Sequence, residues 1–291
     1  MNVQKNNAKW SLLFLTPQLL GLIAFAIIPL ISAFVISFMK WDGFSQRTFV
    51  GISNYVNQLS QSDFWTATYN TILYTILTVP VGLLLSLVLA VALNKIKGKE
   101  LYRLFFFMPV VTSSVSISVI WMWILNGDIG ILNQMLAMIG VEGPNWLTNT
   151  SLVMISIAVL SIWWQLGYNM VIFLAGLQGI SKSYYEAAEI DGASKFQQFY
   201  KITLPMLSPT TFFLAIMALI GSFQVFDQAF VLTQGGPGKA SYTMVYHIYQ
   251  NAFVDFQFGM SSAAAMILFV VILIITLIQF TLQKRWVYYE D

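Results

Sequence analysis

Long apolar runs separated by short polar loops constrain this chain more than any other feature of its sequence. A helix needs about 20 mostly apolar residues to cross a bilayer. The runs span residues 11–39, 68–94, 105–126, 152–178, 207–232 and 262–283. Of the 291 residues, 58% are hydrophobic and only 9% are charged, whereas soluble domains carry about 25% charged residues. The chain is therefore predicted to be an all-α integral membrane protein with six transmembrane helices, and residues 1–291 to form a single membrane domain.

The first apolar run resembles a cleaved signal peptide in one respect, because Lys5 and Lys9 precede it. Its length far exceeds the apolar core of a signal peptide, which is about 7–15 residues long, and no small-x-small cleavage site follows. We therefore expect this helix to be retained. Pro17 and Pro29 are expected to kink it, since a proline inside a helix removes a backbone donor.

The distribution of Lys and Arg predicts the orientation in the membrane, because basic residues accumulate in cytoplasmic loops. With six spans, all but three of the 14 basic residues fall on the side that holds both termini and the loop after the fourth run. The three exceptions are Lys40, Arg47 and Lys239. We expect a multi-pass protein of the cell membrane whose N- and C-termini are cytoplasmic.

The composition excludes several other classes of function. The chain has no cysteine and one histidine, His247. An intramembrane hydrolase or metalloenzyme would need a nucleophile with a base, or clustered metal ligands, and one histidine in a predicted outer loop cannot supply them. An ion-coupled transporter generally needs titratable groups within the membrane, and beyond Asp227 the predicted spans contain essentially none. A net charge of +2 gives no argument for nucleic acid as a partner.

A polar segment between the fourth and fifth apolar runs carries its own signals for two short helices. Ser183 and Glu186 have the spacing of a capping box, in which a hydroxyl and a carboxylate each satisfy a free backbone donor at a helix start. Ser194 and Gln197 repeat this spacing. Gly192 suits the helix end between the two boxes, because glycine adopts the left-handed conformation without a Cβ clash.

The same segment contains a spaced motif: Glu-Ala-Ala, three residues, Gly, nine residues and Ile-x-Leu-Pro. Its members are Glu186, Ala187, Ala188, Gly192, Ile202, Leu204 and Pro205. At full spacing it is similar to the cytoplasmic loop motif of binding-protein-dependent ABC importer permeases. Other stretches resemble the sugar-importing, MalF-like branch of that family: Phe107-Met-Pro-Val-Val, Phe173-Leu-Ala-Gly-Leu-Gln-Gly-Ile, Phe223-Gln-Val-Phe-Asp-Gln and Leu232-Thr-Gln-Gly-Gly-Pro-Gly. The resemblance covers nearly the whole chain, which has only the six-helix core and lacks the extra helices and large outer domain of the maltose permease.

The resemblance implies that this chain is half of a pore. Such a permease pairs with a second, homologous permease subunit, rests on two ABC ATPase subunits, and receives a sugar or oligosaccharide from an extracellular binding protein. The chain itself would have no catalytic activity. No Gly-rich phosphate loop ending in Lys-Ser/Thr occurs in the sequence, so we expect no cofactor on this chain, and ATP with Mg on the ATPase subunits. Membrane lipid is a further expected partner.

Residues 183–205, hereafter the coupling loop, are similar to the coupling helices that insert into the ATPase subunits in this family. Small side chains allow close approach, and Glu186 could form a charge-assisted hydrogen bond with a basic residue of the ATPase. The alternative is an amphipathic loop helix with a solvated charged face. The predicted docking residues are Glu186, Ala187, Ala188, Asp191, Gly192 and Ala193.

Polar residues within the fourth predicted helix indicate a sugar site, since polar groups inside spans are costly and usually face a cavity or the bundle interior. Ser161, Trp164, Gln165 and Tyr168 share one face, and Asn169 lies off it. Aromatic rings beside an amide and hydroxyls can contact both the C–H faces and the hydroxyl edges of a sugar. The family places substrate contacts on this same helix. The alternative is a packing face with interfacial aromatic residues.

The fifth predicted helix adds Ser222, Gln224 and Asp227 as candidate substrate-binding residues, with Gln228 on the face of the last two. Asp227 could hydrogen-bond a sugar hydroxyl or pair with the partner subunit, and both interpretations stay open. The serines of the third predicted helix, including Ser114, are more typical of helix packing.

A sugar is not the only cargo that the resemblance allows. Other ABC import permeases carry glycerol-phosphate, amino acids or oligopeptides. Recognition of phosphate or carboxylate would favour Arg or Lys in the pore. The predicted spans contain neither residue type, although the partner subunit could provide one.

Overall fold

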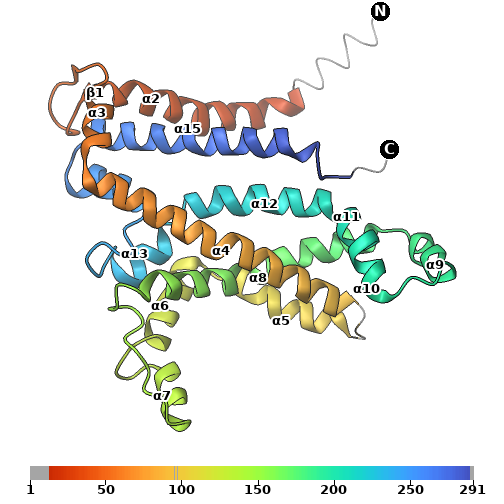
Figure 1. The fold of residues 1–291 in the computed structure, drawn as a ribbon. Coiled ribbons are helices and arrows are strands. Elements are labelled where there is room, and N and C mark those ends of the chain that lie inside the picture. Colours follow the sequence, from red (N-terminus) through yellow and green to blue (C-terminus); the bar gives the residue numbers. More distant parts are fainter. Residues whose placement is uncertain (1–12, 95, 97, 289–291) are drawn as a thin grey trace, which may run out of the picture. The chain divides into compact units, whose positions relative to one another are not determined.

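The computed structural model describes residues 13–94, 96 and 98–288 (Figure 1). Four helices are long and apolar enough to cross a membrane, and the number rises to six if each of two bent helix pairs is counted as one span. The four are Leu13–Ser37, Ser62–Asn94, Val153–Gly179 and Phe258–Gln283. The described chain is therefore an all-α membrane protein, as predicted.

The chain divides into two compact units, Met1–Gln61 with Ile248–Val270, and Ser62–His247 with Val271–Asp291. Some predictions fall on residues outside the described part, namely residues 11 and 12 of the first span and the basic residues Lys5, Lys9, Lys95 and Lys97. The orientation in the membrane and the single-domain organisation stay predictions.

The first unit begins with the helix Leu13–Ser37, which is interrupted by one π turn. This turn, η1 (Ile23–Ile27), leads into α2 (Ile28–Ser37). Pro29 has no N–H for the carbonyl four residues earlier, and the π turn lies directly before it. The irregularity expected at Pro29 therefore takes this form, whereas Pro17 lies within regular α-helix.

A tight loop follows α2 and is fixed by side-chain hydrogen bonds. The strands β1 (Met39–Lys40) and β2 (Thr48–Phe49) pair antiparallel. Between them the Asp42 carboxylate accepts hydrogen bonds from the backbone N–H groups of Ser45 at 2.7 Å and Phe44 at 3.0 Å. These donors lower the pKa of Asp42 from 3.8 to about 2.

The first unit contains three further elements, α3 (Ser53–Ser60), η3 (Gln250–Val254) and the first half of α15 (Phe258–Gln283). Of these, α3 and α15 contact the residues around this loop. The side-chain amide of Asn54 donates to the carbonyls of Ser37 at 2.8 Å and Met39 at 2.9 Å. A Cβ on Gly259 would lie 2.0 Å from the same Met39 carbonyl, so only glycine allows α15 to approach the loop this closely.

The second unit contains most of the helices, including those that line the candidate site. They are α4 (Ser62–Asn94), α5 (Lys99–Val111), α6 (Ser114–Ile124), α7 (Ile131–Met138), α8 (Val153–Gly179), α9 (Lys182–Ile190), α10 (Lys195–Gln198), η2 (Phe199–Thr203), α11 (Leu204–Met206), α12 (Ser208–Phe223), α13 (Asp227–Thr233) and α14 (Met244–Tyr249). The pair α4 and α8 makes the most extensive helix contact, and α5 packs on α8 (Figure 1). The short helices α3, α7 and α14 lie outside the six predicted spans.

The third predicted span, 105–126, is wrong as a single helix. Residues 105–111 belong to α5, and the chain bends by 97° before α6. Thr112 and Ser113 adopt extended backbone conformations, with ψ of 144° and 135°. Hydrophobicity is continuous through this bend, so a window of apolar residues does not reveal it.

The fifth predicted span, 207–232, is also broken. Helix α12 ends at Phe223, three residues follow without helical structure, and α13 begins at Asp227. A second bend of 60° separates α12 from the helical segment Lys195–Met206 before it. The polar side chains of this region therefore do not lie on one helix axis.

Two apolar clusters divide the second unit along its long helices. One contains Val153, Met154, Ile157 and Leu160 of α8 together with Tyr74 of α4 and Val225, Ala229 and Leu232 beyond the α12 break. The other contains Met170, Phe173, Leu174 and Leu177 of α8 with Ala90 and Leu93 of α4 and Leu207 and Leu214. The stretch of α8 between the clusters, residues 161–169, is the polar one. The fold therefore places polar side chains between two apolar cores.

Candidate transport site and coupling loop

A cavity of about 540 Å³ lies between the two apolar clusters and is lined by α4, the end of α5, α6, α8, α12 and the start of α13. Its volume is within the range of about 300–1,000 Å³ that is usual for sites of small ligands. All seven residues predicted to bind substrate line it: Ser161, Trp164, Gln165, Tyr168, Ser222, Gln224 and Asp227. The structure thus brings together residues from two separate stretches of sequence, while their role in binding stays a prediction.

Helix α8 supplies one wall of the cavity. The Trp164 indole N–H donates to the carbonyl of Thr112 at 3.2 Å, which ties this ring to the bend between α5 and α6. The Ser161 hydroxyl is buried and donates to the Ile157 carbonyl at 2.9 Å, so it can act only as an acceptor toward a ligand. Gln165 and Tyr168 are exposed to the cavity side.

The break between α12 and α13 supplies the opposite wall. The Ser222 hydroxyl donates to the Leu219 carbonyl at 2.8 Å and receives a hydrogen bond from Thr75 of α4 at 3.0 Å. The Asp227 side chain is half-buried and accepts a hydrogen bond from the Ser114 hydroxyl of α6. The two breaks in the helices, at residues 112–113 and 224–226, are therefore joined by a hydrogen bond beside the cavity.

Several lining residues were not among the predicted site residues. Asn169 lies off the predicted face of α8 and Ser114 was assigned to helix packing, yet both line the cavity, as do Tyr74, Thr78 and Gln228. A straight-helix face could not identify Ser114 or relate Ser222 to Asp227, because the backbone changes direction between them. The run of hydroxyl residues at 112–114 was the available signal, since it coincides with the bend.

The coupling loop begins with a helix cap that differs from the predicted one. Helix α9 starts at Lys182 and its N-cap is Ser181, whose side chain accepts a hydrogen bond from the Ser183 N–H at 3.4 Å. The predicted capping box of Ser183 with Glu186 is therefore wrong. Ser183 already lies inside the helix, where its hydroxyl can no longer serve as the cap.

The end of α9 is a Schellman motif, and this explains the need for glycine at position 192. Gly192 has φ of +77°, a left-handed conformation that side chains with a Cβ rarely adopt. Its N–H donates to the Glu189 carbonyl at 3.1 Å, and the Ala193 N–H donates to the Ala188 carbonyl at 2.8 Å. These are the two bonds that define the motif, so the predicted role of Gly192 at the helix end is confirmed.

The second predicted capping box is also confirmed. The Ser194 hydroxyl accepts from the Gln197 N–H at 3.3 Å, and the Gln197 side chain accepts from the Ser194 N–H at 2.7 Å. The N-cap of α10, Ser194, therefore lies two residues after the left-handed turn at Gly192. The direction of the chain between the two short helices is set by backbone hydrogen bonds.

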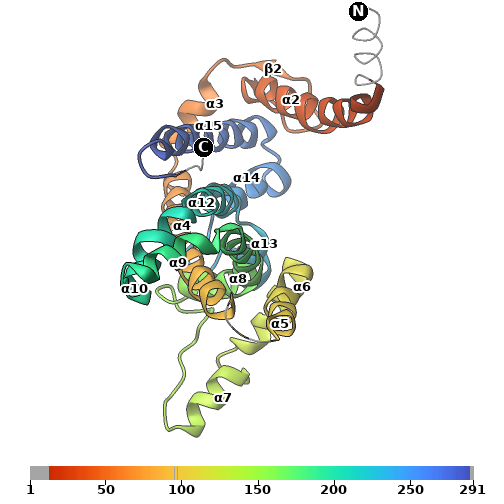
Figure 2. The same cartoon turned by 90° about the vertical axis from the view of Figure 1, so that its right-hand side faces the viewer.

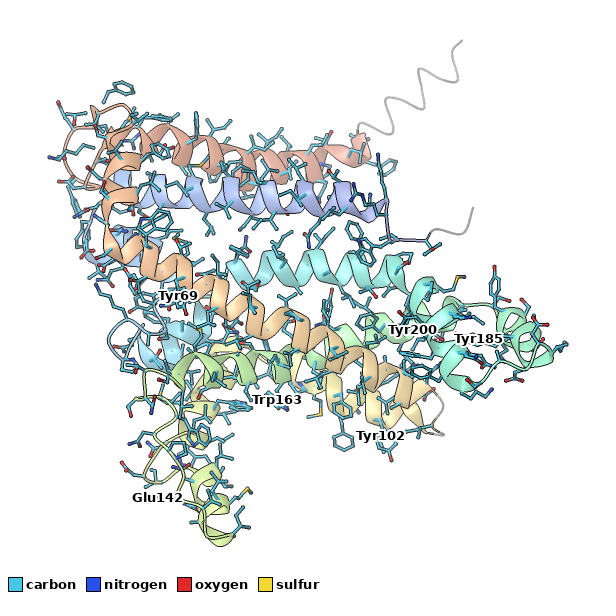
Figure 3. The ribbon with its side chains drawn as sticks, viewed as in Figure 1. Tyr69, Tyr102, Glu142, Trp163, Tyr185 and Tyr200 are labelled. Carbon is cyan, nitrogen blue, oxygen red and sulfur yellow. The ribbon has the colours of Figure 1, made fainter. Side chains whose placement is uncertain are left out.

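Side chains then hold the two halves of the coupling loop together. The Tyr185 hydroxyl of α9 lies 3.0 Å from the Thr203 hydroxyl of η2. Lys195 of α10 forms an ion pair with Glu189 of α9, and this ammonium group lowers the pKa of the Glu189 carboxyl. Figure 3 shows Tyr185 within the projecting loop and Tyr200 nearer its base.

The coupling loop projects from one end of the second unit (Figure 1), and this end faces the viewer in Figure 2. Of the predicted docking residues, Glu186, Ala187, Asp191 and Gly192 are exposed, and Ala188 and Ala193 are half-buried. The exposed fraction of Ile190 is 87% and that of Phe196 is 76%. These two apolar side chains are candidates for contact with a partner, and the prediction from sequence did not include them.

Comparisons with known proteins agree with these features. The family described as "Binding-protein-dependent transport system inner membrane component" matches residues 79–288. The probable ABC transporter permease YesP of Bacillus subtilis is 36% identical over 284 residues, which cover 96% of this chain and 91% of YesP. AraP of the same species, an arabinooligosaccharides transport system permease, is 35% identical over 275 residues, covering 93% of this chain and 87% of AraP. UgpA of Agrobacterium fabrum, an sn-glycerol-3-phosphate transport system permease, is 33% identical over 280 residues, covering 95% of each chain.

Solved structures show the same fold. A bacterial ABC transporter involved in the import of the acidic polysaccharide alginate contains a chain that matches with a TM-score of 0.85 at 23% identity, over 98% of this chain and 99% of that one. A bacterial alginate ABC transporter in complex with an alginate pentasaccharide-bound periplasmic protein gives a TM-score of 0.84 at 22% identity, over 98% and 96%. The likeness in sequence over nearly full length, together with the family match, identifies the class of this protein. The chain belongs to the binding-protein-dependent transport system inner membrane components, which are the permease subunits of ABC transporters.

Proposed function

We propose that this permease forms one half of the pore of an ATP-driven importer for a sugar or oligosaccharide. The observation that carries the proposal is the lining of the cavity. Five of its polar side chains make no hydrogen bond with any described residue: Gln165, Tyr168, Asn169, Gln224 and Gln228. Such groups are available to a ligand.

The mixture of groups fits a carbohydrate. Amides and hydroxyls both donate and accept hydrogen bonds, as the hydroxyls of a sugar do. Trp164 and Tyr168 add aromatic faces, against which the C–H faces of a sugar ring can pack. The relative AraP, which is named for arabinooligosaccharides, supports the same class of cargo.

Uptake by the complex of this chain with its partner subunits and binding protein tests the proposal. Trp164→Ala and Gln165→Ala each remove contacts within the cavity, and we expect uptake of labelled oligosaccharides to fall roughly three- to tenfold, the worth of one or two hydrogen bonds. Trp163→Ala is the matched control, because Trp163 is the neighbouring residue of α8 but does not line the cavity. Equal uptake by all three variants and the wild type would remove these residues from the site.

The proposal includes the partners of this permease. We propose that a second, homologous permease completes the pore, that two ATPase subunits bind ATP and Mg and receive the coupling loop, and that an extracellular binding protein delivers the cargo. The coupling loop and both termini then lie in the cytoplasm. The alginate transporter bound to its periplasmic protein supports delivery by a binding protein, and the exposed Ile190 and Phe196 support docking to a partner.

Crosslinking tests the docking. The chain has no cysteine, so Ile190→Cys gives one thiol at the tip of α9. We expect it to crosslink to an ATPase subunit in the intact complex. Ile139→Cys, at a residue after α7 that is 74% exposed, should not do so. A coupling loop that is labelled from the cell exterior, or that crosslinks to no ATPase subunit, would contradict the proposal.

A second candidate cargo is glycerol-phosphate, because UgpA is similar over nearly its full length. The lining of the cavity favours the sugar. Phosphate recognition uses Arg, Lys or clustered backbone donors, and the lining residues include no Lys, Arg or His.

A further inference from the structure

The wall of the cavity carries a single charged side chain. Among the lining residues Asp227 is the one Asp or Glu, and there is no Lys, Arg or His. Five of the six lining helices, α4, α6, α8, α12 and α13, contain no basic residue. The sixth, α5, contributes only Val110 to the lining, and its Arg103 lies seven positions earlier along the helix. A negative charge in the cavity of this chain therefore has no positive charge beside it.

One oxygen of the Asp227 carboxylate accepts a hydrogen bond that holds the side chain in place, and the other oxygen is available to a ligand. The Ser114 hydroxyl donates to Oδ2. Oδ1 accepts no hydrogen bond from any described residue. Since Ser114 also lines the cavity, this hydrogen bond fixes the side chain at the edge of the space that a ligand would occupy.

Such a carboxylate distinguishes ligands by charge. A sugar hydroxyl can donate to Oδ1, and hydrogen bonds to a charged acceptor are about twice as strong as those between neutral groups. A phosphate or uronate group would instead place a second negative charge near the first. Repulsion between like charges is stronger in a partly desolvated site than in water.

We propose that Asp227, oriented by Ser114, makes the cavity selective for uncharged or cationic carbohydrates and excludes those that bear carboxylate or phosphate groups. The proposal rests on the proposed function, and it specifies the substrate class of the same cavity. Asp227 is the residue that determines specificity, and Ser114 is a positioning residue.

A single introduced thiol can measure the charge of this cavity, because the chain has no cysteine of its own. Gly221 lines the cavity, and a Cβ at this position meets no heavy atom within 4 Å. Gly221→Cys is therefore placed in the complex, with cysteine-free partner subunits. Its reaction rates are measured with two methanethiosulfonates, the cationic aminoethyl and the anionic sulfonatoethyl reagent.

We expect Asp227→Asn to lower the ratio of the cationic to the anionic rate by about tenfold, as expected for loss of one nearby charge in a partly desolvated site. The matched control is Gly179→Cys. A Cβ at this position also meets nothing within 4 Å, but the residue lies outside the cavity. Asp227→Asn should leave the ratio at Gly179→Cys unchanged. Ser114→Ala keeps the charge and should change the ratio at Gly221→Cys by less than about threefold. The proposal would be overturned if Asp227→Asn changed the ratio at Gly221→Cys by less than twofold.

Protection of the Gly221→Cys thiol from labelling by added carbohydrates distinguishes failure of this inference from failure of the proposed function. We expect maltotriose, xylotriose or arabinotriose at millimolar concentration to slow labelling, trigalacturonate not to, and Asp227→Asn to allow protection by trigalacturonate. Ser114→Ala should weaken protection by the neutral trisaccharide, and Ser114→Thr, which keeps the hydroxyl, should restore it. Protection of the wild-type cavity by trigalacturonate equal to that by neutral trisaccharides would overturn the charge selection. Absence of protection by every carbohydrate, with a rate ratio that still depends on Asp227, would contradict the sugar cargo and support the charge selection.

Discussion

The coupling loop and the cavity obtain their geometry in different ways. In the coupling loop, the Schellman motif and the capping box join residues that are at most five positions apart along the chain. In the cavity, Thr75 contacts Ser222 and Ser114 contacts Asp227, across more than 100 positions in each case. The loop therefore carries its shape in its own sequence, whereas the cavity depends on the packing of the helices that surround it.

The two regions also differ in which of the described side chains lack a partner: apolar ones in the coupling loop and polar ones in the cavity. The backbone of the coupling loop is capped, but its apolar side chains Ile190 and Phe196 are exposed. The cavity has apolar clusters on both sides and polar side chains without partners between them. A local change should therefore damage the coupling loop at its turns, and the cavity at its helix contacts.

The largest effect is expected for Gly192→Pro. Proline fixes φ near −65° and has no N–H, whereas Gly192 has φ of +77° and donates to the Glu189 carbonyl. We expect transport to be lost while the transmembrane helices remain folded, measured by uptake and by ATPase activity of the reconstituted complex. The same substitution at Gly140, which has φ of +78° but follows α7, should leave ATPase activity intact. Wild-type uptake by Gly192→Pro would show that the shape of the coupling loop is not needed.

The corresponding change on the side of the cavity is Gly167→Ala. A Cβ on this buried glycine of α8 would lie 1.8 Å from the carbonyl oxygen of Phe106 in α5. Because the clash is with backbone, the helices must separate, and we expect the free energy of unfolding to fall by about 1–3 kcal/mol. Thermal unfolding in detergent measures this, with Gly179→Ala, where the added methyl meets nothing within 4 Å, as the control. Equal stability of the two variants would contradict the close contact of α5 with α8.

A smaller effect is expected for Tyr185→Phe. This substitution removes the 3.0 Å contact with the Thr203 hydroxyl, which is worth about 0.5–1.5 kcal/mol, and leaves the ring in place. We expect cargo transported per ATP hydrolysed to fall about two- to fivefold with normal assembly. Tyr102→Phe, an exposed tyrosine of α5 (Figure 3), is the control. An unchanged ratio for Tyr185→Phe would mean that this contact does not keep the two halves of the loop together.

The smallest effect is expected for Glu189→Gln. The side chains of Lys195 and Glu189 are 70% and 53% exposed, and exposed ion pairs contribute little. The pKa of Glu189 is lowered below 4.5 by Lys195, so the contribution of the pair is fully present above this value and is lost as the pH falls through the lowered pKa. We expect Tm to differ from wild type by less than about 2 °C at pH 7, and the difference to disappear once the pH is well below the lowered pKa. If the difference in Tm persisted at the lower pH, its cause would be something other than the charge of Glu189.

The sequence predicted the regular helices and the loop motif, and it failed where helices break. Ser194, Gln197 and Gly192 could be assigned because their partners are close along the chain. The bend at residues 112–113 and the break at 224–226 lie within continuous hydrophobic stretches, where tertiary packing determines the path of the backbone. The same limit explains the site. Polar residues of α8 were found from their spacing, whereas Ser114 and Asn169 needed the three-dimensional arrangement.

The two apolar clusters on either side of the cavity have a consequence for the route of the cargo. Both clusters are made of buried side chains from α8 and its neighbours, and close-packed interiors leave no space for a solute. A molecule resting against Gln165 and Gln224 cannot continue along the helices through the interior of this subunit. The cargo of the proposed importer would therefore move along the surface of the second unit rather than through its interior.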